Sequence, residues 1–187
     1  MARRVRRLAV VVLLLLIAGA VALVLTTRSG LENKRDDVDR AWMPLRKPLA
    51  ERYGQLAGVN AQMGAAGAGD RSVTRALATT LARWDQLRRA NDGDADADAE
   101  AETADRLEGL ATRVRAIVLS SDRLRAVDPL NQSLAAFQGA VPPLPAVKRY
   151  NDAAQEYENA RNGVLRRPVA KLFGYDSRPQ LQLSDSP

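Results

Sequence analysis

The feature that most constrains this chain is an uncharged apolar stretch near the N-terminus, residues 8–27, with the sequence LAVVVLLLLIAGAVALVLTT. Roughly 20 helical residues, each rising about 1.5 Å, cross a bilayer core that is about 30 Å thick. The stretch is apolar on every side rather than along one stripe, which is typical of a membrane span and not of a core helix in a small protein. It therefore predicts an N-terminal transmembrane helix.

Residues 1–7 form a basic flank that carries four arginines. A cleaved signal peptide is the competing interpretation, because Ala20-Val21-Ala22 has the A-x-A form of a cleavage site. The apolar run continues past that site to Leu25, so cleavage would leave an apolar new N-terminus, and we expect the segment to be retained as an anchor. The arginine density beside the membrane predicts that the N-terminus lies inside and the body outside the cytoplasmic membrane.

The chain contains no histidine and no cysteine, which removes imidazole bases, thiol nucleophiles and the commonest transition-metal ligands. Asp94, Asp96 and Asp98 alternate as in a calcium loop, but the sixth position of that loop is Ala99, where an EF-hand needs glycine. We interpret this run as an acidic turn between helices. We expect no catalytic residue, no cofactor and no metal site, and we predict that the protein is not an enzyme.

The net charge of +6 does not indicate a nucleic-acid partner, because basic and acidic residues are interleaved along the body. Aromatic residues make up 4% of the chain, too few for stacking platforms that hold single strands. We expect no nucleic acid among the partners. Attraction to anionic lipid headgroups is compatible with a basic chain tethered at a membrane.

Apolar residues of the body recur at steps of three and four, which is the spacing of one helix face. The pattern predicts helices over residues 38–63, 72–90, 99–127 and 145–167, with a shorter helical segment over 130–137. Pro44 and Pro48 predict a kink in the first of these, or a helix that begins at Pro44. Arg167-Pro168 is expected to end the last one.

These patterns predict an all-α fold, with the transmembrane helix followed by an antiparallel bundle of about four long helices. The bundle domain would occupy residues 31–175, and residues 176–187 would form a disordered tail. The first and fourth helices carry most of the large aromatic residues, so we expect them to be neighbours. The near-heptad repeat of the fourth helix also allows a homo-oligomer.

Two segments at the ends of the body carry a family resemblance. One is Arg149-Tyr150-Asn151-Asp152-Ala153-Ala154-Gln155-Glu156-Tyr157 with the later Leu172-Phe173-Gly174-Tyr175, and the other comprises Asn33, Val38, Ala41-Trp42, Leu49 and Arg52-Tyr53. Together they resemble the two signatures of the LemA family of bacterial proteins. The resemblance implies an N-terminal membrane segment followed by a long-helix bundle, and it implies no settled biochemical activity. The chain departs from the family pattern at residues 54–58 and at Glu158.

The candidate functional surface combines residues of both signatures with an apolar patch near the C-terminus. It comprises Trp42, Arg52, Tyr53, Tyr150, Asn151, Asp152, Tyr157, Leu172, Phe173 and Tyr175. One interpretation is a polar pocket between the first and fourth helices. The other, which we favour, is that the aromatic residues are core anchors, as aromatics at helical spacing usually are, while Asn151 and Asp152 bond across helices or face solvent.

The predicted function is that of a non-catalytic, membrane-anchored helical scaffold or adaptor of the bacterial cell envelope. Its expected partners are the lipid bilayer and other membrane or envelope proteins. The alternative is an extracytoplasmic sensor, in which a small ligand enters the bundle between the first and fourth helices.

Overall fold

The structure is a computed structural model that describes residues 2–69, 71–90, 97–164 and 166–184. The side chains of residues 2–13, 16, 20 and 90 are not described. Every regular element in these ranges is a helix, and none of the described residues forms a β-strand. The all-α prediction is confirmed.

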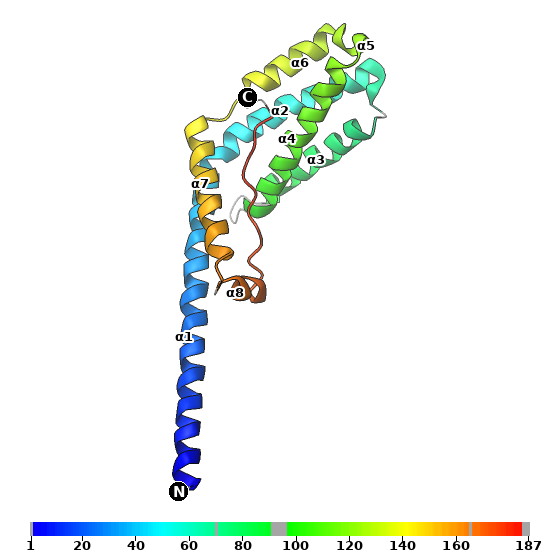
Figure 1. The fold of residues 1–187 in the computed structure, drawn as a ribbon. Helices are drawn as coiled ribbons and strands as arrows, with labels where there is room; N and C mark the ends of the chain where they lie inside the picture. Colours follow the sequence, from blue (N-terminus) through cyan, green and yellow to red (C-terminus); the bar gives the residue numbers. More distant parts are fainter. Residues whose placement is uncertain (1, 70, 91–96, 165, 185–187) are drawn as a thin grey trace.

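The chain begins with one long helix, α1 (Ala2–Trp42), which contains the apolar stretch and continues into the body (Figure 1). It passes through Gly30 without a break, and Leu31 and Val38 beyond it are buried. A 3₁₀ turn, η1 (Met43–Leu45), then redirects the chain into α2 (Arg46–Met63). The predicted kink is confirmed, because Pro44 in this turn has no N–H to donate to the preceding helical turn.

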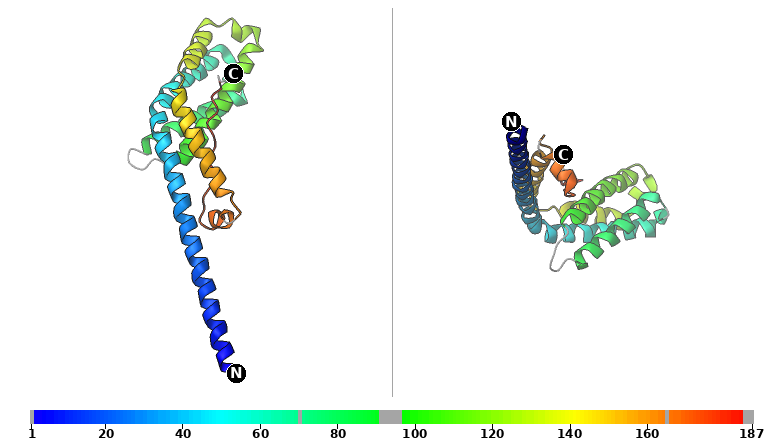
Figure 2. Two further views of the ribbon diagram at one scale, coloured as in Figure 1. Left: turned by 60° about the vertical axis from the view of Figure 1, so that its left-hand side comes forward. Right: turned by 90° about the horizontal axis from the view of Figure 1, so that it is seen from below.

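The head of the molecule consists of the helices from α2 to α6, which follow this kink. After α2, a π-helical turn, η2 (Gly64–Ala68), leads into α3 (Ser72–Ala90), and α4 (Ala97–Leu119) runs back along α3. A short helix α5 (Asp122–Arg125) and then α6 (Asp128–Gly139) return the chain along α2. Figure 2 shows these helices gathered at one end, far from the N-terminus.

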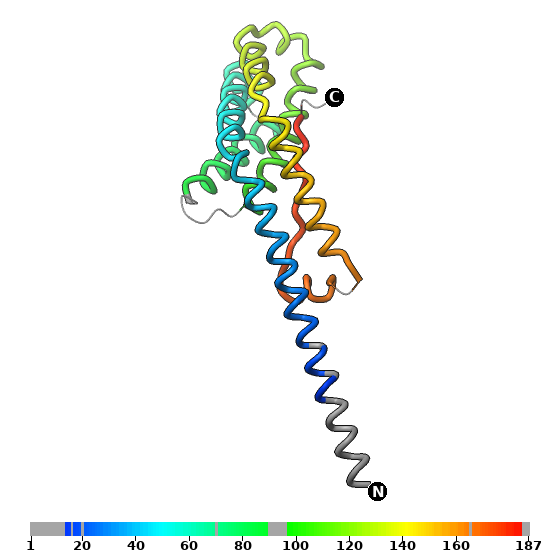
Figure 3. Tube along the Cα trace, turned by 90° about the vertical axis from the view of Figure 1, so that its left-hand side faces the viewer, coloured from blue at the N-terminus to red at the C-terminus, as the bar shows by residue number. Residues whose placement is uncertain are grey.

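The stalk pairs α1 with α7 (Leu144–Arg161), which descends antiparallel to it (Figure 1). The predicted neighbourhood of the first helix (38–63) and the fourth holds at the start of the first, where α7 lies along α1 and meets η1. In contrast, α2, which forms most of that predicted helix, packs mainly on α6 and α3. After the short helix α8 (Arg167–Leu172), the chain reverses in a turn at Phe173-Gly174, and residues 175–183 run beside α7 back toward the head (Figures 1 and 3).

Two predicted helix ends were wrong. The helix predicted over 99–127 ends at Leu119, because Ser121 is extended (φ −120°, ψ 109°) and the Ser120 hydroxyl donates to the Ile117 carbonyl at 3.0 Å. The fourth helix ends at Arg161 rather than at 167. Pro168 does not end a helix; it stands in the first turn of α8, where its missing N–H has no intrahelical partner to lose.

The C-terminal segment also differs from the prediction. Residues 176–184, expected to be disordered, are packed on the helices, and Leu181 and Leu183 are only 3% and 7% exposed. Residues 185–187 lie outside the described part of the chain. We call residues 176–184 the C-terminal strap.

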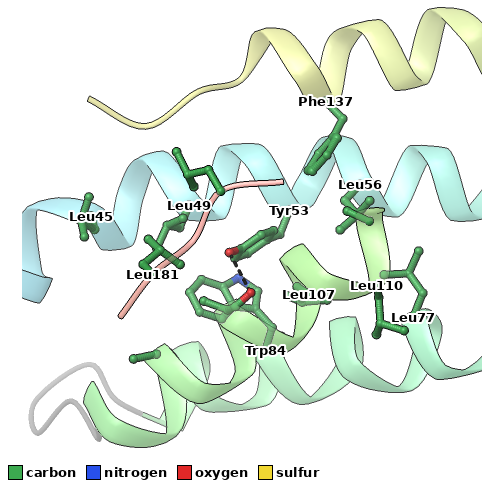
Figure 4. Close-up of a cluster of buried hydrophobic side chains, with 14 of the residues drawn as sticks. Leu45, Leu49, Tyr53, Leu56, Leu77, Trp84, Leu107, Leu110, Phe137 and Leu181 are labelled. Atoms are coloured by element: carbon green, nitrogen blue, oxygen red, sulfur yellow. Dashed lines mark hydrogen bonds between the residues drawn. The ribbon is translucent and has the colours of Figure 1, made fainter. Parts of the chain in front are cut away.

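The hydrophobic core lies mainly in the head (Figure 4). Tyr53 of α2 meets Trp84 of α3 edge to face, with ring centroids 4.9 Å apart. Leu181 of the strap joins this cluster close to Leu45 and Leu49. The strap therefore contributes side chains to the same core as the helices.

Most of the described side chains in the apolar stretch of α1 are solvent-exposed, although Val24 is half-buried and Thr27 is buried. Six large residues are 49–66% exposed, namely Leu14, Leu15, Ile17, Val21, Leu23 and Leu25. Side chains 8–13, 16 and 20 of the predicted membrane segment lie outside the description. Over the residues that remain, no helix meets the length and hydropathy that a bilayer span requires.

Candidate functional site

The predicted inter-helix aromatics meet where α7 crosses the end of α1. The rings of Trp42 and Tyr150 lie 5.0 Å apart and both are fully buried. The Trp42 indole N–H donates to the Glu100 carboxylate at 2.8 Å, and the Tyr150 hydroxyl donates to the Pro179 carbonyl at 2.8 Å. Both rings act as core anchors, and the polar tip of Tyr150 reaches the strap.

One face of α7 binds the main chain of the strap. The Asn151 side chain accepts from the Leu181 N–H at 2.8 Å and donates to the Leu181 carbonyl at 3.1 Å. The Tyr157 hydroxyl donates to the Asp176 carbonyl at 2.9 Å. These bonds supply partners for backbone groups that an extended segment leaves unsatisfied, which explains why the strap is ordered.

Glu158 extends this set of contacts by one residue. Its carboxylate accepts from the Arg178 N–H at 2.9 Å and from the Arg161 guanidinium at 2.9 Å. Burial alone raises the pKa of the Glu158 carboxyl, but the hydrogen bonds from Arg161 and Arg178 outweigh it and bring the pKa below its ordinary value. Glu158 therefore stays ionised while it holds the strap.

The side chain of Arg178 enters an acidic socket that two other helices build. The residue is 3% exposed, and its guanidinium pairs with Asp39 of α1 at 2.9 Å and with Asp98 of α4. Asp98 also pairs with Arg35 of α1 at 2.9 Å. The strap is thus held by ion pairs of the Arg178 side chain as well as by hydrogen bonds to its backbone.

The upper end of the strap meets a buried ion pair in the head. Arg52 and Glu108 form a bidentate pair, with Nε–Oε1 at 2.7 Å and Nη2–Oε2 at 3.0 Å, and Arg52 is fully buried. Arg52 also donates to the Phe137 carbonyl at 3.1 Å and to the Ser184 hydroxyl at 3.0 Å. The Ser184 N–H in turn donates to Glu108 at 2.9 Å.

The structure therefore divides the predicted surface into parts. Tyr150, Asn151 and Tyr157 bind the strap, and Arg52 bonds its upper end. Trp42 packs against Tyr150, whereas Tyr53 points into the head and donates to the Ala104 carbonyl. Burial of the phenol raises the pKa of Tyr53, as it does for Tyr150, and it raises the pKa of Tyr157 to about 12. All three hydroxyls stay protonated as hydrogen-bond donors at neutral pH.

The remaining predicted residues lie apart from the strap's contacts. Asp152 is exposed and pairs with Lys148 one turn earlier at 2.6 Å. Leu172 and Phe173 are exposed, and the Arg28 guanidinium lies 5.1 Å above the Phe173 ring. Tyr175 is buried and packs with Leu31 of α1 and Ala170 of α8.

Two buried carboxylates on α4 were missed from the sequence. Glu100 accepts bonds from Trp42 and from Arg46, the latter bidentate at 2.8 and 2.9 Å, and it fixes α4 to the kink after α1. Glu108 lies eight positions later on the same buried face. Their signal was available: both acids fall on the apolar stripe that includes Ala104 and Leu107, where a charge needs a partner.

Of the acidic turn predicted around Asp94, Asp96 and Asp98, the first two residues lie outside the described part of the chain, and Asp98 lies in the first turn of α4 rather than in a turn between helices. Arg178 and the pairing role of Asp98 were missed for a different reason. Neither residue falls on a helical stripe, and only the fold brings them together.

A surface trough of about 590 Å³ also lies between α1 and α7, lined by charges of both signs that include Arg40, Arg149 and Glu156. No set of three acidic residues suited to a metal ion occurs among the described residues.

The arrangement is chemically suited to binding an extended polypeptide, since side-chain amides, phenols and carboxylates meet main-chain groups along one face of α7. We call this surface, formed by α7 with Asp39 and Asp98, the strap groove. Compared with protein-family models, curated proteins and solved structures, the chain matches none of them.

Proposed function

We propose that the protein is a non-catalytic, membrane-anchored helical scaffold or adaptor of the bacterial cell envelope, as its resemblance to the LemA family implies. The observation that carries the proposal is the exposed apolar surface of α1, where residues such as Leu14 and Leu25 are 60% exposed. Continuous apolar surface of this kind is normally covered by lipid or protein. The all-round apolar character and the preceding arginines favour lipid.

The continuity of α1 supports a scaffold rather than a loosely tethered domain. The helix runs from the apolar stretch to Trp42 without a linker, and from Leu31 onward it packs against the body. The segment between Thr27 and Trp42 spans roughly 20 Å as a helix. The head is thereby held at a set height above the bilayer, where tethering raises its effective concentration toward membrane partners.

The use of the buried charges supports a non-catalytic role. Arg52 pairs with Glu108, and Arg46 pairs with Glu100. Both pairs join α4 to the α1–α2 unit, and breaking a pair of this kind is costly to the fold. The geometry thus gives these charged groups a structural role.

The sensor alternative receives less support from the packing. A ligand between the first and fourth helices would occupy the position where the Trp42 and Tyr150 rings meet at 5.0 Å. The neighbouring polar groups of α7 are engaged by the strap. Binding there would require displacement of packed side chains or of the strap.

Membrane attachment is tested by alkaline carbonate extraction of cell membranes. The full chain should stay in the pellet, a variant without residues 8–27 should move to the supernatant, and a variant with an unrelated transmembrane helix at 8–27 should again pellet. A reporter active only outside the cytoplasm, fused after Pro187, should be active. Extraction of the full chain by carbonate would overturn the anchor.

The adaptor role is tested by chemical cross-linking in intact cells. The body should be joined to specific envelope proteins, with the same set recovered when the unrelated transmembrane helix replaces residues 8–27. Recovery of no protein beyond those joined to an unrelated anchored helical domain would refute the adaptor role.

A further inference from the structure

We infer that the strap groove is a peptide-binding site and that the strap is its tethered, displaceable occupant. The external ligand that fits the groove is an extended protein segment with an arginine followed by apolar side chains three and five residues later. This inference deepens the proposed adaptor function and rests on it for the partner being a protein met at the membrane.

The strap groove forms hydrogen bonds with the main chain of its occupant. Tyr150, Asn151 and Tyr157 bind backbone groups of Pro179, Leu181 and Asp176, respectively, and none of these bonds depends on the occupant's side chains. Asn151 bonds both the N–H and the carbonyl of one residue, as a neighbouring β-strand would. Main-chain bonding of this kind accepts any extended segment whose side chains fit.

Side-chain selectivity comes from an acidic socket and an apolar surface. Asp39 and Asp98 pair with the buried Arg178, so the socket is complementary in charge to an arginine. Leu181 and Leu183 alternate along the strap and are both buried, while Gln182 between them is exposed. This alternation is the pattern by which an added strand is selected.

The helical body is closed in part by contacts that the strap does not make. The contacts that close the helical body, Trp42 with Tyr150, Tyr53 with Trp84, and Arg52 with Glu108, are made between helices. The strap is reached through Gly174, whose φ of +68° makes a sharp reversal after α8. Displacement of the strap would require movement at this turn, would expose Leu181 and Leu183 and would remove the Ser184 bonds to Arg52 and Glu108, but none of the three helix contacts includes an atom of the strap.

The test uses the purified full chain in detergent micelles and a fluorescent peptide with the sequence of residues 176–184, DSRPQLQLS. In the wild-type protein the peptide competes with a tethered copy at millimolar effective concentration. Leu181→Asp in the protein removes a buried strap contact, and we expect it to tighten peptide binding at least tenfold. Gln182→Asp is the matched control, since it adds the same charge at an exposed position, and it should bind the peptide with the same affinity as the wild-type protein.

Two further measurements locate the bound peptide. Asn151→Ala, combined with Leu181→Asp, should lower peptide affinity at least tenfold relative to Leu181→Asp alone. A peptide with glutamate in place of its arginine should bind the Leu181→Asp protein at least tenfold more weakly, because the socket is acidic. Unchanged affinity in both measurements would overturn the assignment to this groove.

Three other results would also overturn the inference. The first is a folded Leu181→Asp protein that binds the peptide no better than wild type. The second is loss of the helical circular dichroism of Leu181→Asp, which would make the strap an integral part of the fold. The third is a wild-type dimer that exchanges straps, which would make a second copy the ligand. These assays need no membrane, so their failure is distinct from failure of the carbonate or cross-linking tests.

Discussion

The buried Arg52–Glu108 pair gives the sharpest stability prediction. Glu108 accepts from Arg52 Nε at 2.7 Å, from Arg52 Nη2 at 3.0 Å and from the Ser184 N–H at 2.9 Å. Glu108→Gln preserves the shape of the side chain but removes the charge that faces a fully buried guanidinium. Water cannot replace the lost partner without opening the interface between α2 and α4, so the arginine remains as an uncompensated buried charge.

Removal of one partner of such a pair costs about 3–5 kcal/mol of unfolding free energy. In a protein of this size each kcal/mol lowers Tm by about 2–4 °C, so Glu108→Gln should lower Tm by roughly 6–20 °C. The assay is thermal and urea unfolding followed by circular dichroism. Glu102→Gln, an exposed position on the same helix, is the matched control and should stay within about 0.5 kcal/mol of wild type.

A double-mutant cycle completes the test. Replacing both partners with apolar residues, Arg52→Met with Glu108→Leu, removes the stranded charge and should cost much less than the sum of the two single replacements. Additive losses would show that the two groups contribute independently. A cost below about 1 kcal/mol for Glu108→Gln would likewise refute the reasoning, because it falls under the penalty for an unpaired buried charge.

Three further predictions concern the strap and one turn of the head. Asn151→Ala removes two hydrogen bonds worth about 0.5–1.5 kcal/mol each, so hydrogen exchange of the strap amides should become about tenfold faster or more. Asp152→Ala, on the solvent-exposed side of α7, should leave the exchange rate of those amides unchanged. The pKa of Glu158 is lowered from 4.5, so its contribution to strap docking is complete above that value and is lost as pH falls through the lower folded pKa. Proteolysis within the strap, measured with an acid-active protease, should therefore increase as pH falls below 4.5 and through the lowered pKa, and Glu158→Gln should weaken this dependence. Gly67→Ala should destabilise the protein by about 1 kcal/mol or more in urea unfolding, because the φ of Gly67 is +72° and the new Cβ would lie 2.8 Å from the Arg123 guanidinium. A Cβ at Gly64 would meet nothing within 4 Å, so Gly64→Ala should not destabilise the protein.

Helix periodicity predicted much of the fold because it is a local signal. The kink at Pro44, the second helix over 72–90 and the meeting of Trp42 with Tyr150 all follow from spacing, prolines and aromatic content. The helix ends at Leu119 and Arg161 were missed because the apolar stripe continues past both. At those points a serine pair and an Asn-Gly pair decide the backbone direction, and their effect is weaker in sequence than that of proline.

The strap could not be predicted from its own residues. Its order depends on Asn151 and Tyr157 of α7, on Asp39 of α1 and on Asp98 of α4, and only the folded chain brings these together. The sole local signal is the alternation of Leu181 and Leu183, which is the period of an extended chain with one buried face. A short alternating stretch beside a proline is equally typical of an unfolded tail.

The anchor and the groove act together in the proposed adaptor. The strap competes with any external segment at the effective concentration set by its short connection to α8, so a dilute partner gains little occupancy of the groove. A partner confined to the same membrane surface is itself concentrated, and it then competes on comparable terms. The upper end of the strap adds a second consequence, because Ser184 bonds both Arg52 and Glu108. A segment that lacks a hydroxyl at that position leaves one donor of a buried guanidinium unsatisfied, and the groove should therefore prefer serine or threonine three residues after the first apolar side chain.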